Sequence, residues 1–197
     1  KRSIIPPKKK KENKPVDFDY IRLLVHTNPS LTTIGKKKPE MFEIAIGGNK
    51  EDQLNYAKEK LGKEINITEV FKEGQQLDIH AVSRAKGVQG PVKRFGISLK
   101  QHKSEKGVRR PGTLGGWKAQ GHIMWRVAKA GQMGYHARTE HNKWLLKISN
   151  ANEISRNGGF HDYGVIRSQC IIVKGSIAGA KKRLIRLNAS LQPNKLR

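Results

Sequence analysis

The sequence predicts a mainly β domain, a small β-barrel with one inserted helix and a long irregular basic extension. Short apolar alternations in 20–85 and again in 144–190 have the period of half-buried strands. One stretch, about 50–61, has helical spacing instead. Residues 86–143 hold 10 of the chain's 20 glycines and show neither period. A chain of 197 residues fits one such domain with extensions.

Each predicted strand is an alternating run bounded by turn residues. The runs before the extension are 21–25, 42–46 and 77–81, and 68–71 is predicted to form a short helical turn. The runs after the extension are Trp144–Ile148, Gly164–Lys174 and Leu184–Leu187. Many short strands with one good helix are typical of a small barrel.

The predicted helix has recognisable ends. Asn49 is a suitable N-cap, and Gly62 is a suitable stop. Leu54, Ala57 and Leu61 recur at helical spacing, so they are expected to share one buried face.

Charge is distributed unevenly along the chain. Forty basic residues oppose 16 acidic ones, which gives a net charge of +24. Residues 1–39, 40–80, 81–147 and 148–197 carry net charges of +8, −4, +13 and +7. Over half of the excess therefore lies in one third of the chain. Such a patch predicts a polyanionic partner, and the acidic block is expected to face away from it.

The sequence argues against a membrane partner and against disulfides. No apolar run approaches the roughly 18 residues of a spanning helix, and no signal-peptide pattern opens the chain. The single cysteine, Cys170, lies in the apolar run 170–173. We expect it to be a core residue in a reducing compartment rather than a reactive thiol.

Catalytic and metal sites are not predicted. His136 and His141 lie five residues apart without the glutamate of a His-Glu-x-x-His motif. His26 and His80 fall in predicted strands, where a structural histidine is expected. The glycine-rich segment offers only Glu105 and one other carboxylate, too few for acid–base chemistry. We therefore expect no catalytic residue, metal, cofactor or small-molecule substrate.

The glycine-rich segment has the composition of an RNA-binding loop. Glycine and lysine cannot bury enough apolar surface to offset the entropy of ordering, about 1–2 kcal/mol per residue. Lysine and arginine placed near phosphates release counterions and so favour RNA binding. The residues predicted to bind RNA are Lys86, Lys93, Arg94, Lys100, Lys103, Lys106, Arg109, Arg110, Trp117, Lys118, Arg126, Lys129, His136, Arg138 and Lys143.

The three tryptophans receive different predictions. Trp117 lies among glycines on the basic segment, so it is expected to meet an unpaired base or an RNA cavity. Trp125 has Ile123 and Met124 beside it and is expected to fold back onto the core. Trp144 begins a predicted strand and is also expected in the core.

Several long motifs follow one another along the chain. They are Lys86-Gly87-Val88-Gln89-Gly90-Pro91-Val92-Lys93-Arg94-Phe95-Gly96, Arg109-Arg110-Pro111-Gly112, Leu114-Gly115-Gly116-Trp117, Ala130-Gly131-Gln132-Met133-Gly134-Tyr135-His136-Ala137-Arg138-Thr139-Glu140, Asn142-Lys143, Asn157-Gly158-Gly159-Phe160, Val173-Lys174-Gly175-Ser176-Ile177-Ala178-Gly179 and Lys182-Arg183-Leu184, with a weaker match at Lys36-Lys37-Lys38-Pro39. In order and length these motifs resemble the universal large-subunit ribosomal protein three family, in its archaeal and eukaryotic branch, over most of the chain from about Tyr20.

The resemblance implies a fold and a role. The fold is a six-stranded, translation-factor-like β-barrel with a finger that runs through rRNA toward the peptidyl transferase centre. Trp117 matches a tryptophan at the finger tip, near incoming aminoacyl-tRNA. The implied role is structural, in the cytoplasmic large ribosomal subunit and its assembly, with large-subunit rRNA and neighbouring ribosomal proteins as partners. A free-standing RNA-binding translation or assembly factor is the alternative.

The resemblance also predicts how the chain is divided. Nothing here matches the long N-terminal portion of the family, so an incomplete chain is expected. The Lys8–Lys11 run could be a localisation signal, a tail or a second rRNA contact. The predicted parts are a basic N-terminal segment at 1–19, the first barrel strands at 20–85, the rRNA-penetrating extension at 86–143, the remaining strands at 144–190 and a tail at 191–197.

Overall fold

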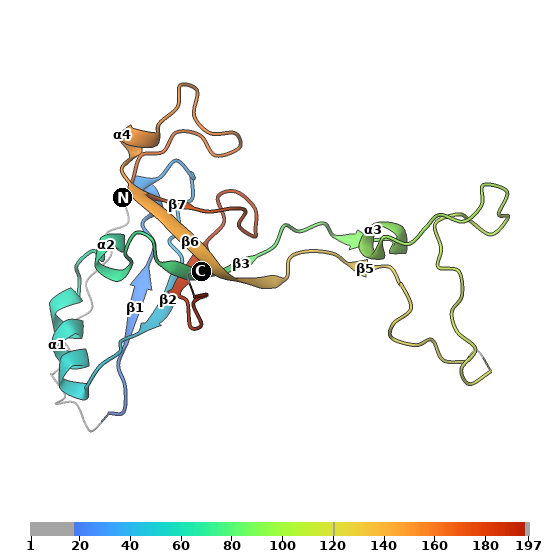
Figure 1. Cartoon of the computed structure of the whole chain (residues 1–197), viewed down its shortest axis with the longest axis horizontal. Helices are drawn as coiled ribbons and strands as arrows, with labels where there is room; N and C mark the ends of the chain where they lie inside the picture. Colours follow the sequence, from blue (N-terminus) through green and yellow to red (C-terminus); the bar gives the residue numbers. More distant parts are fainter. Residues whose placement is uncertain (1–17, 120, 196–197) are drawn as a thin grey trace. The chain divides into compact units, whose positions relative to one another are not determined.

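The computed structural model describes residues 18–119 and 121–195 (Figure 1). The chain divides between Val70 and Phe71 into two compact units. Most of the predicted basic segment at 1–19, with its lysine run, lies outside the described residues.

The first unit contains a two-stranded antiparallel sheet followed by a helix. Its elements are β1 Arg22–His26, the 3-10 turn Pro29–Leu31, β2 Met41–Ala45, α1 Lys50–Lys60 and α2 Ile67–Val70. Leu24 pairs with Glu43 at the centre of the ladder, and Arg22 Nη1 contacts Glu43 Oε2 at 3.1 Å. The strands, the helix and the short helical turn predicted in this region are confirmed.

The predicted apolar face of helix α1 is half-buried at Leu54 and Ala57, and an amide also fixes the helix to its unit. Gln53 is its only buried residue in the described chain, and its side chain accepts from the Ile21 N–H at 2.9 Å and donates to the Gly48 carbonyl at 2.8 Å. Leu61, predicted on the buried face, is 78% exposed because it lies at the C-cap, where the backbone is already extended. Asn49 is the N-cap, but its side chain makes no capping hydrogen bond.

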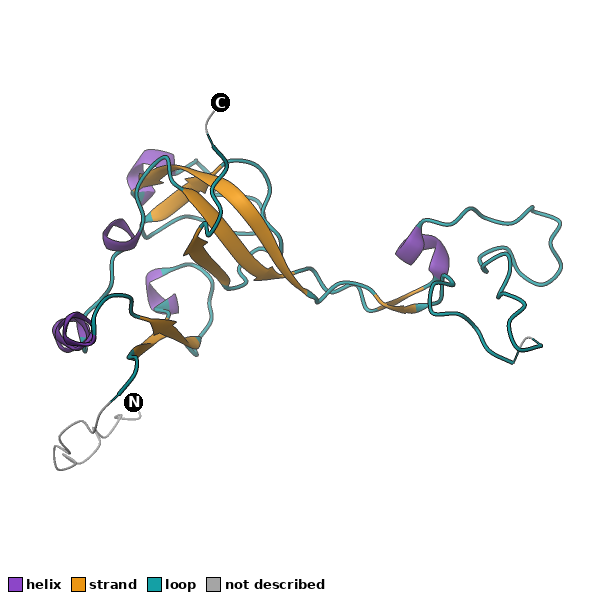
Figure 2. Ribbon diagram, turned by 60° about the horizontal axis from the view of Figure 1, so that its bottom comes forward, coloured by secondary structure: helices purple, strands orange, loops and turns teal. Residues whose placement is uncertain are grey.

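The second unit is organised around a four-stranded antiparallel sheet (Figure 2). Its strand order is β7-β6-β3-β8, and the short helix α4 follows β6. The bounds are β3 Gln76–Val82, β6 Ala137–Ser149, α4 Ala151–Ile154, β7 Cys170–Val173 and β8 Ile185–Ala189. Cys170, predicted in the core, lies in β7 and is only half-buried; burial raises the pKa of its thiol.

Strands β3 and β6 supply the core of this unit. Leu77, Ile79 and Leu145 are fully buried, and Ala81 is 7% exposed. Trp144, predicted in the core, is only half-buried. The alternation of Leu77, Ile79 and Ala81 therefore placed the central strand correctly, because a strand with one buried face must repeat every second residue.

Two strand predictions need correction. Strand β6 begins at Ala137, well before Trp144, and its early part carries polar side chains: Arg138 pairs with Ala81 and Glu140 with Ile79. These residues pair through their backbones, so no apolar period marks them. Strand β7 is shorter than the predicted run Gly164–Lys174.

The mainly β fold class is confirmed, with more residues in strands than in helices. Strands β7 and β8 form the two edges of the four-stranded sheet, and no sheet of the described residues closes on itself. The closed barrel therefore stays a prediction.

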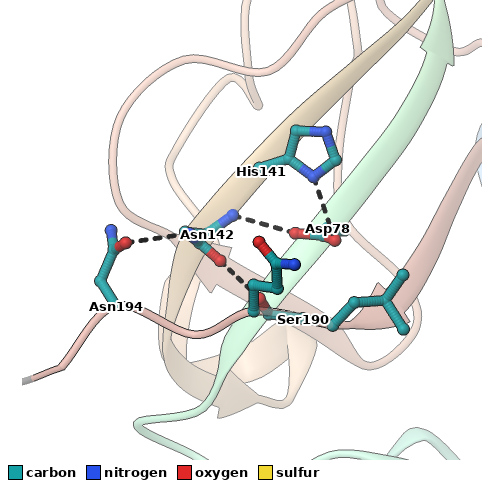
Figure 3. Close-up of a pocket in the computed structure, with 7 residues that line it drawn as sticks. Asp78, His141, Asn142, Ser190 and Asn194 are labelled. Carbon is teal, nitrogen blue, oxygen red and sulfur yellow. Dashed lines mark hydrogen bonds and ion pairs between the residues drawn. The ribbon is translucent and has the colours of Figure 1, made fainter.

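A bulge interrupts the pairing of β3 with β6, and Asp78 holds it in place (Figure 3). Leu77 pairs with Lys143 but Ile79 pairs with Glu140, so Asp78 faces two residues of β6. The Asp78 side chain is 6% exposed, and its carboxylate accepts the Asn142 N–H at 3.0 Å and contacts His141 Nδ1 at 3.1 Å.

Electrostatics favour the charged form of this carboxylate. The Asn142 N–H is the largest cause that lowers the pKa of Asp78, and His141 adds to it against the cost of burial. Asn142 itself adopts a left-handed backbone, with φ of 56°, which the bulge requires. A buried hydrogen-bonded charge thus stabilises a backbone conformation that is costly by itself.

The segment after β8 packs onto the bulge through amides. Asn142 accepts from the Ser190 hydroxyl and donates Nδ2 to Asn194 Oδ1 at 3.1 Å. Gln76 donates to the Asn194 carbonyl at 3.0 Å and accepts from the Asn194 N–H at 2.8 Å. Asn142, Ser190 and Asn194, together with Asp78 and His141, line a cavity of about 330 Å³. The polar network explains why Gln76 and Asp78 are buried on the sheet face opposite Leu77.

Replacing Asp78 with Asn is expected to lower the melting temperature at pH 7 by several degrees, because the amide cannot accept from both Asn142 and His141 as the carboxylate does. The pKa of Asp78 is lowered in the folded state, so its stabilisation is complete above the unfolded value of about 3.9 and is lost as pH falls through the folded value. The melting temperature of the wild type should therefore approach that of D78N as the pH is lowered.

Thermal unfolding from pH 7 to pH 2.5 measures this difference. Glu43→Gln, which alters an exposed ion pair, is the control and should change the melting temperature little. A D78N difference that stays constant throughout the acid range would contradict the role given to the Asp78 charge.

Candidate nucleic-acid interface

Residues 83–136, here called the extension, connect β3 to β6 (Figure 1). The predicted segment 86–143 covers most of it and also includes the first residues of β6. The two arms of the extension continue the β3–β6 pairing as a stem formed by 83–89 and 131–136. Strands β4 Val88–Gln89 and β5 Gly131–Gln132 pair within this stem.

The stem is bridged by main-chain hydrogen bonds along its length. Ser83 N donates to the His136 carbonyl at 2.9 Å, and Lys86 N donates to the Met133 carbonyl at 3.0 Å. Met133 N donates back to the Gly87 carbonyl at 2.9 Å. The stem therefore has a defined structure, although its sequence shows no strand period.

Close contact between the arms requires glycine at one position. Gly134 has φ of +76°, and a Cβ atom there would lie 1.9 Å from the Arg84 carbonyl oxygen. No side chain fits at that distance, and the backbone conformation itself disfavours L-residues. Gly134 therefore permits the approach of the two arms.

Two arginines hold the stem by binding its carbonyls. Arg183 Nη1 donates to the carbonyls of Val82 and Ser83 at 3.1 and 2.8 Å, and its guanidinium lies 5.5 Å from the centre of the Tyr135 ring. Further out, Arg94 Nη1 donates to the Lys129 carbonyl at 3.0 Å. Both guanidinium groups thus have protein partners that fix the stem.

The outer part begins with the short helix α3 Pro91–Phe95, which sequence periodicity did not reveal. Proline at its start and the left-handed Gly96 at its end define it, but five residues are too few to show a helical repeat. Farther along, Gly121 N donates to the Lys118 carbonyl at 2.8 Å and closes a turn. Trp117 contacts His122 edge-on across that turn, with 5.3 Å between ring centres.

Most predicted rRNA-binding residues are exposed. Those exposed to solvent are Lys86, Lys93, Lys103, Lys106, Arg109, Arg110, Trp117, Lys118, Arg126, Lys129, His136 and Arg138. The half-buried ones are Arg94, Lys100 and Lys143. Among these, Lys143 lies on β6 and contacts Glu140 Oε2 at 2.8 Å and the Ser176 carbonyl at 2.9 Å. Their contacts with RNA stay predictions.

The extension has almost no negative charge of its own. It holds 12 lysines and arginines but one acidic residue, Glu105. In the described residues, none of these 12 cations pairs with a carboxylate. Elsewhere cations do pair: Lys60 contacts Glu69 at 2.6 Å, and this hydrogen bond is the main cause that raises the pKa of Lys60. Carboxylates of the described residues therefore do not neutralise the positive charge of the extension.

Large apolar side chains of the extension are also exposed. Trp117 is 58% exposed, as predicted for a loop tryptophan. Trp125 is 93% exposed, so the prediction that it folds onto the core is wrong. Ile123 is exposed too, and the described residues on either side of it form neither helix nor strand. The neighbouring Arg126, in a segment without periodicity, was the signal for exposure.

The histidines in strands have structural partners, as predicted. His80 Nδ1 lies 2.9 Å from Thr139 Oγ1, and its Nε2 lies 3.4 Å from Asn188 Nδ2. His26 Nδ1 lies 3.1 Å from the Thr27 carbonyl oxygen. Within 18–119 and 121–195, no group of three or more histidine, cysteine, aspartate or glutamate residues is arranged to hold a metal ion. No helix of the part described is both long and apolar enough to span a membrane.

Replacing Gly134 with Ala is expected to separate the arms of the stem. The new Cβ atom would collide with Arg84, and the left-handed backbone adds about 1–3 kcal/mol of strain. Hydrogen exchange of the Lys86 and Met133 amides in the full chain should accelerate roughly tenfold or more. Gly112→Ala, which meets no neighbour, is the matched control. Equal protection in both variants would contradict the close approach at Gly134.

Comparison with known proteins identifies the family. The family model described as ribosomal protein L3 matches residues 9–197. The large ribosomal subunit protein uL3 of Methanocaldococcus jannaschii is 51% identical over 180 residues, which are 89% of this chain and 53% of that protein. The uL3 protein of Archaeoglobus fulgidus is 49% identical over 180 residues, covering 89% of this chain and 54% of its own length.

A third relative agrees with the first two. The uL3 protein of Methanosphaera stadtmanae is 48% identical over 186 residues, 91% of this chain and 55% of its own length. The chain thus spans about half the length of the curated relatives it matches. The match of the family model covers nearly the whole sequence, including the stem, the extension and the sheet. This chain belongs to the ribosomal protein L3 family.

Proposed function

We propose that this chain is a structural constituent of the large ribosomal subunit in the cytoplasm and binds large-subunit rRNA through its extension. The observation that carries the proposal is the set of exposed cations between Ser83 and His136 that lack carboxylate partners in the described chain. The relatives with about half of their residues identical are named large ribosomal subunit proteins, which supports the same role.

RNA can bind both kinds of side chain that the extension exposes, the cations and the apolar side chains. Phosphates attract the unpaired lysines and arginines, and their binding releases condensed counterions. Bases and grooves accommodate the exposed apolar side chains such as Phe95, Leu99 and Trp117. An acidic protein surface would complement the cations. RNA offers phosphates for the cations and bases for the exposed apolar side chains on one strand.

The finer parts of the proposal follow from the family. The extension is the finger that points toward the peptidyl transferase centre, with the turn at Trp117 near its tip. The four-stranded sheet supplies strands of a translation-factor-like β-barrel, and its long central pair β3 and β6 supports this role. The same rRNA contacts would contribute to subunit assembly. The other partners are neighbouring large-subunit proteins.

The role is structural rather than enzymatic. The relatives are named as ribosomal proteins, and the extension has one carboxylate, Glu105, so it offers no carboxylate pair for acid–base chemistry. Neither a cofactor nor a small-molecule substrate forms part of the proposal.

Removing two exposed arginines should reduce the salt dependence of rRNA binding. In Arg109→Gln/Arg110→Gln, the slope of log Kd against log salt concentration is expected to fall by about one for each phosphate that the variant no longer binds. Filter binding of the full chain to large-subunit rRNA at several salt concentrations gives the slope.

The matched control removes two exposed lysines from the first unit, Lys58→Gln/Lys63→Gln. It lowers the net charge equally but leaves the extension intact, so its slope should stay near that of the wild type. Equal slopes in the two double variants would show that the arginines are not phosphate contacts.

Replacing Trp117 with Ala should affect translation more than folding. The side chain is 58% exposed, so its loss leaves no cavity in the core. The variant is expected to remain in large subunits through a high-salt wash, while aminoacyl-tRNA accommodation becomes several-fold slower in rapid-kinetic assays. Tyr20→Ala, another exposed aromatic, serves as control. Loss of the wild-type chain itself in the wash would favour a transient factor, and unchanged accommodation would count against the tip position.

A further inference from the structure

Trp125 is the most exposed large apolar side chain of the described residues, at 93%. An indole normally buries a large area in a core or an interface. The chain around it forms a turn, because Val127 N donates to the Met124 carbonyl at 3.3 Å. Trp125 therefore projects from a turn rather than from a strand or helix.

This tryptophan lacks the ring contacts that the protein gives its other exposed aromatics. Trp117 meets His122 edge-on, and Tyr135 lies against the Arg183 guanidinium. No ring or cation contact to Trp125 occurs among the described residues. Both faces of its indole are open to a partner.

Charge around Trp125 selects the kind of partner. The extension carries 12 cations against one carboxylate, and the residue next to the tryptophan is the exposed Arg126. Charge complementarity therefore favours RNA over another protein surface. On RNA, an open indole beside a cation is suited to stacking on an unpaired base, since every base presents an aromatic face.

We propose that Trp125 stacks on an unpaired base of large-subunit rRNA and forms a contact separate from that of Trp117. This inference rests on the proposed rRNA-binding function. The two tryptophans are associated with different turns: Trp117 contacts His122 across the turn closed by Lys118 and Gly121, and Trp125 lies in the turn closed by Met124 and Val127. Arg126 would bind the adjoining phosphate.

Substitutions that separate aromatic stacking from apolar burial test the proposal. Trp125→Leu keeps an apolar side chain without a ring, and Trp125→Phe keeps a ring. Stacking predicts that the full chain carrying Trp125→Leu binds large-subunit rRNA about 5- to 100-fold more weakly than the wild type, with affinity largely restored by Trp125→Phe. Because no phosphate contact is removed, the salt slope should not change.

One control variant and one further measurement keep the outcomes distinct. Leu191→Ala alters an 89% exposed apolar residue outside the extension and should bind as the wild type does. Fluorescence locates the ring directly: the difference spectrum between wild type and Trp125→Phe should show a solvent-exposed indole that rRNA quenches.

Each remaining result has a definite meaning. Equal affinities for Trp125→Leu and the wild type would overturn the stacking proposal, and so would a buried indole spectrum in the free chain. A blue shift caused by a ribosomal protein but not by rRNA would overturn it in favour of a protein contact. Failure of the wild-type chain to bind rRNA would instead overturn the proposed function itself.

Discussion

The pairing of β3 with β6 is the interaction on which the rest of the second unit depends. The same ladder buries Leu77 and Ile79, carries the bulge at Asp78 and then continues outward as the stem. Core and extension are therefore not separate modules joined by a linker. The extension begins as two strands already paired, so ordering its first residues costs little further entropy.

Sequence reasoning succeeded where one face of an element is buried and failed where burial did not set the pattern. The alternation at 77–81 located the central strand because a half-buried strand must alternate. The start of β6 was missed because Arg138 and Glu140 pair opposite apolar residues of β3. Helix α3 was missed because it is shorter than two turns.

Part of the candidate interface was predictable from composition. Composition alone marked the exposed cations of the extension and Trp117. It could not place Trp125, because a cluster of apolar neighbours does not reveal whether a second layer exists to cover them. Nor could it link Asp78 to Asn142, since their contact depends on a register that appears only when two distant strands pair.

The bulge at Asn142 sets the pairing register of the two arms of the extension. Side chains alternate between the two faces of a paired strand, so shifting one strand by a single residue exchanges every face. The left-handed Asn142 accommodates one extra residue of β6 in the bulge. The pairing between the bulge and the extension is therefore shifted by one residue, through Ala137 and into the stem. Inserting or deleting one residue here would exchange the two faces of the 131–136 arm relative to the 83–89 arm, although the core sequence would be unchanged.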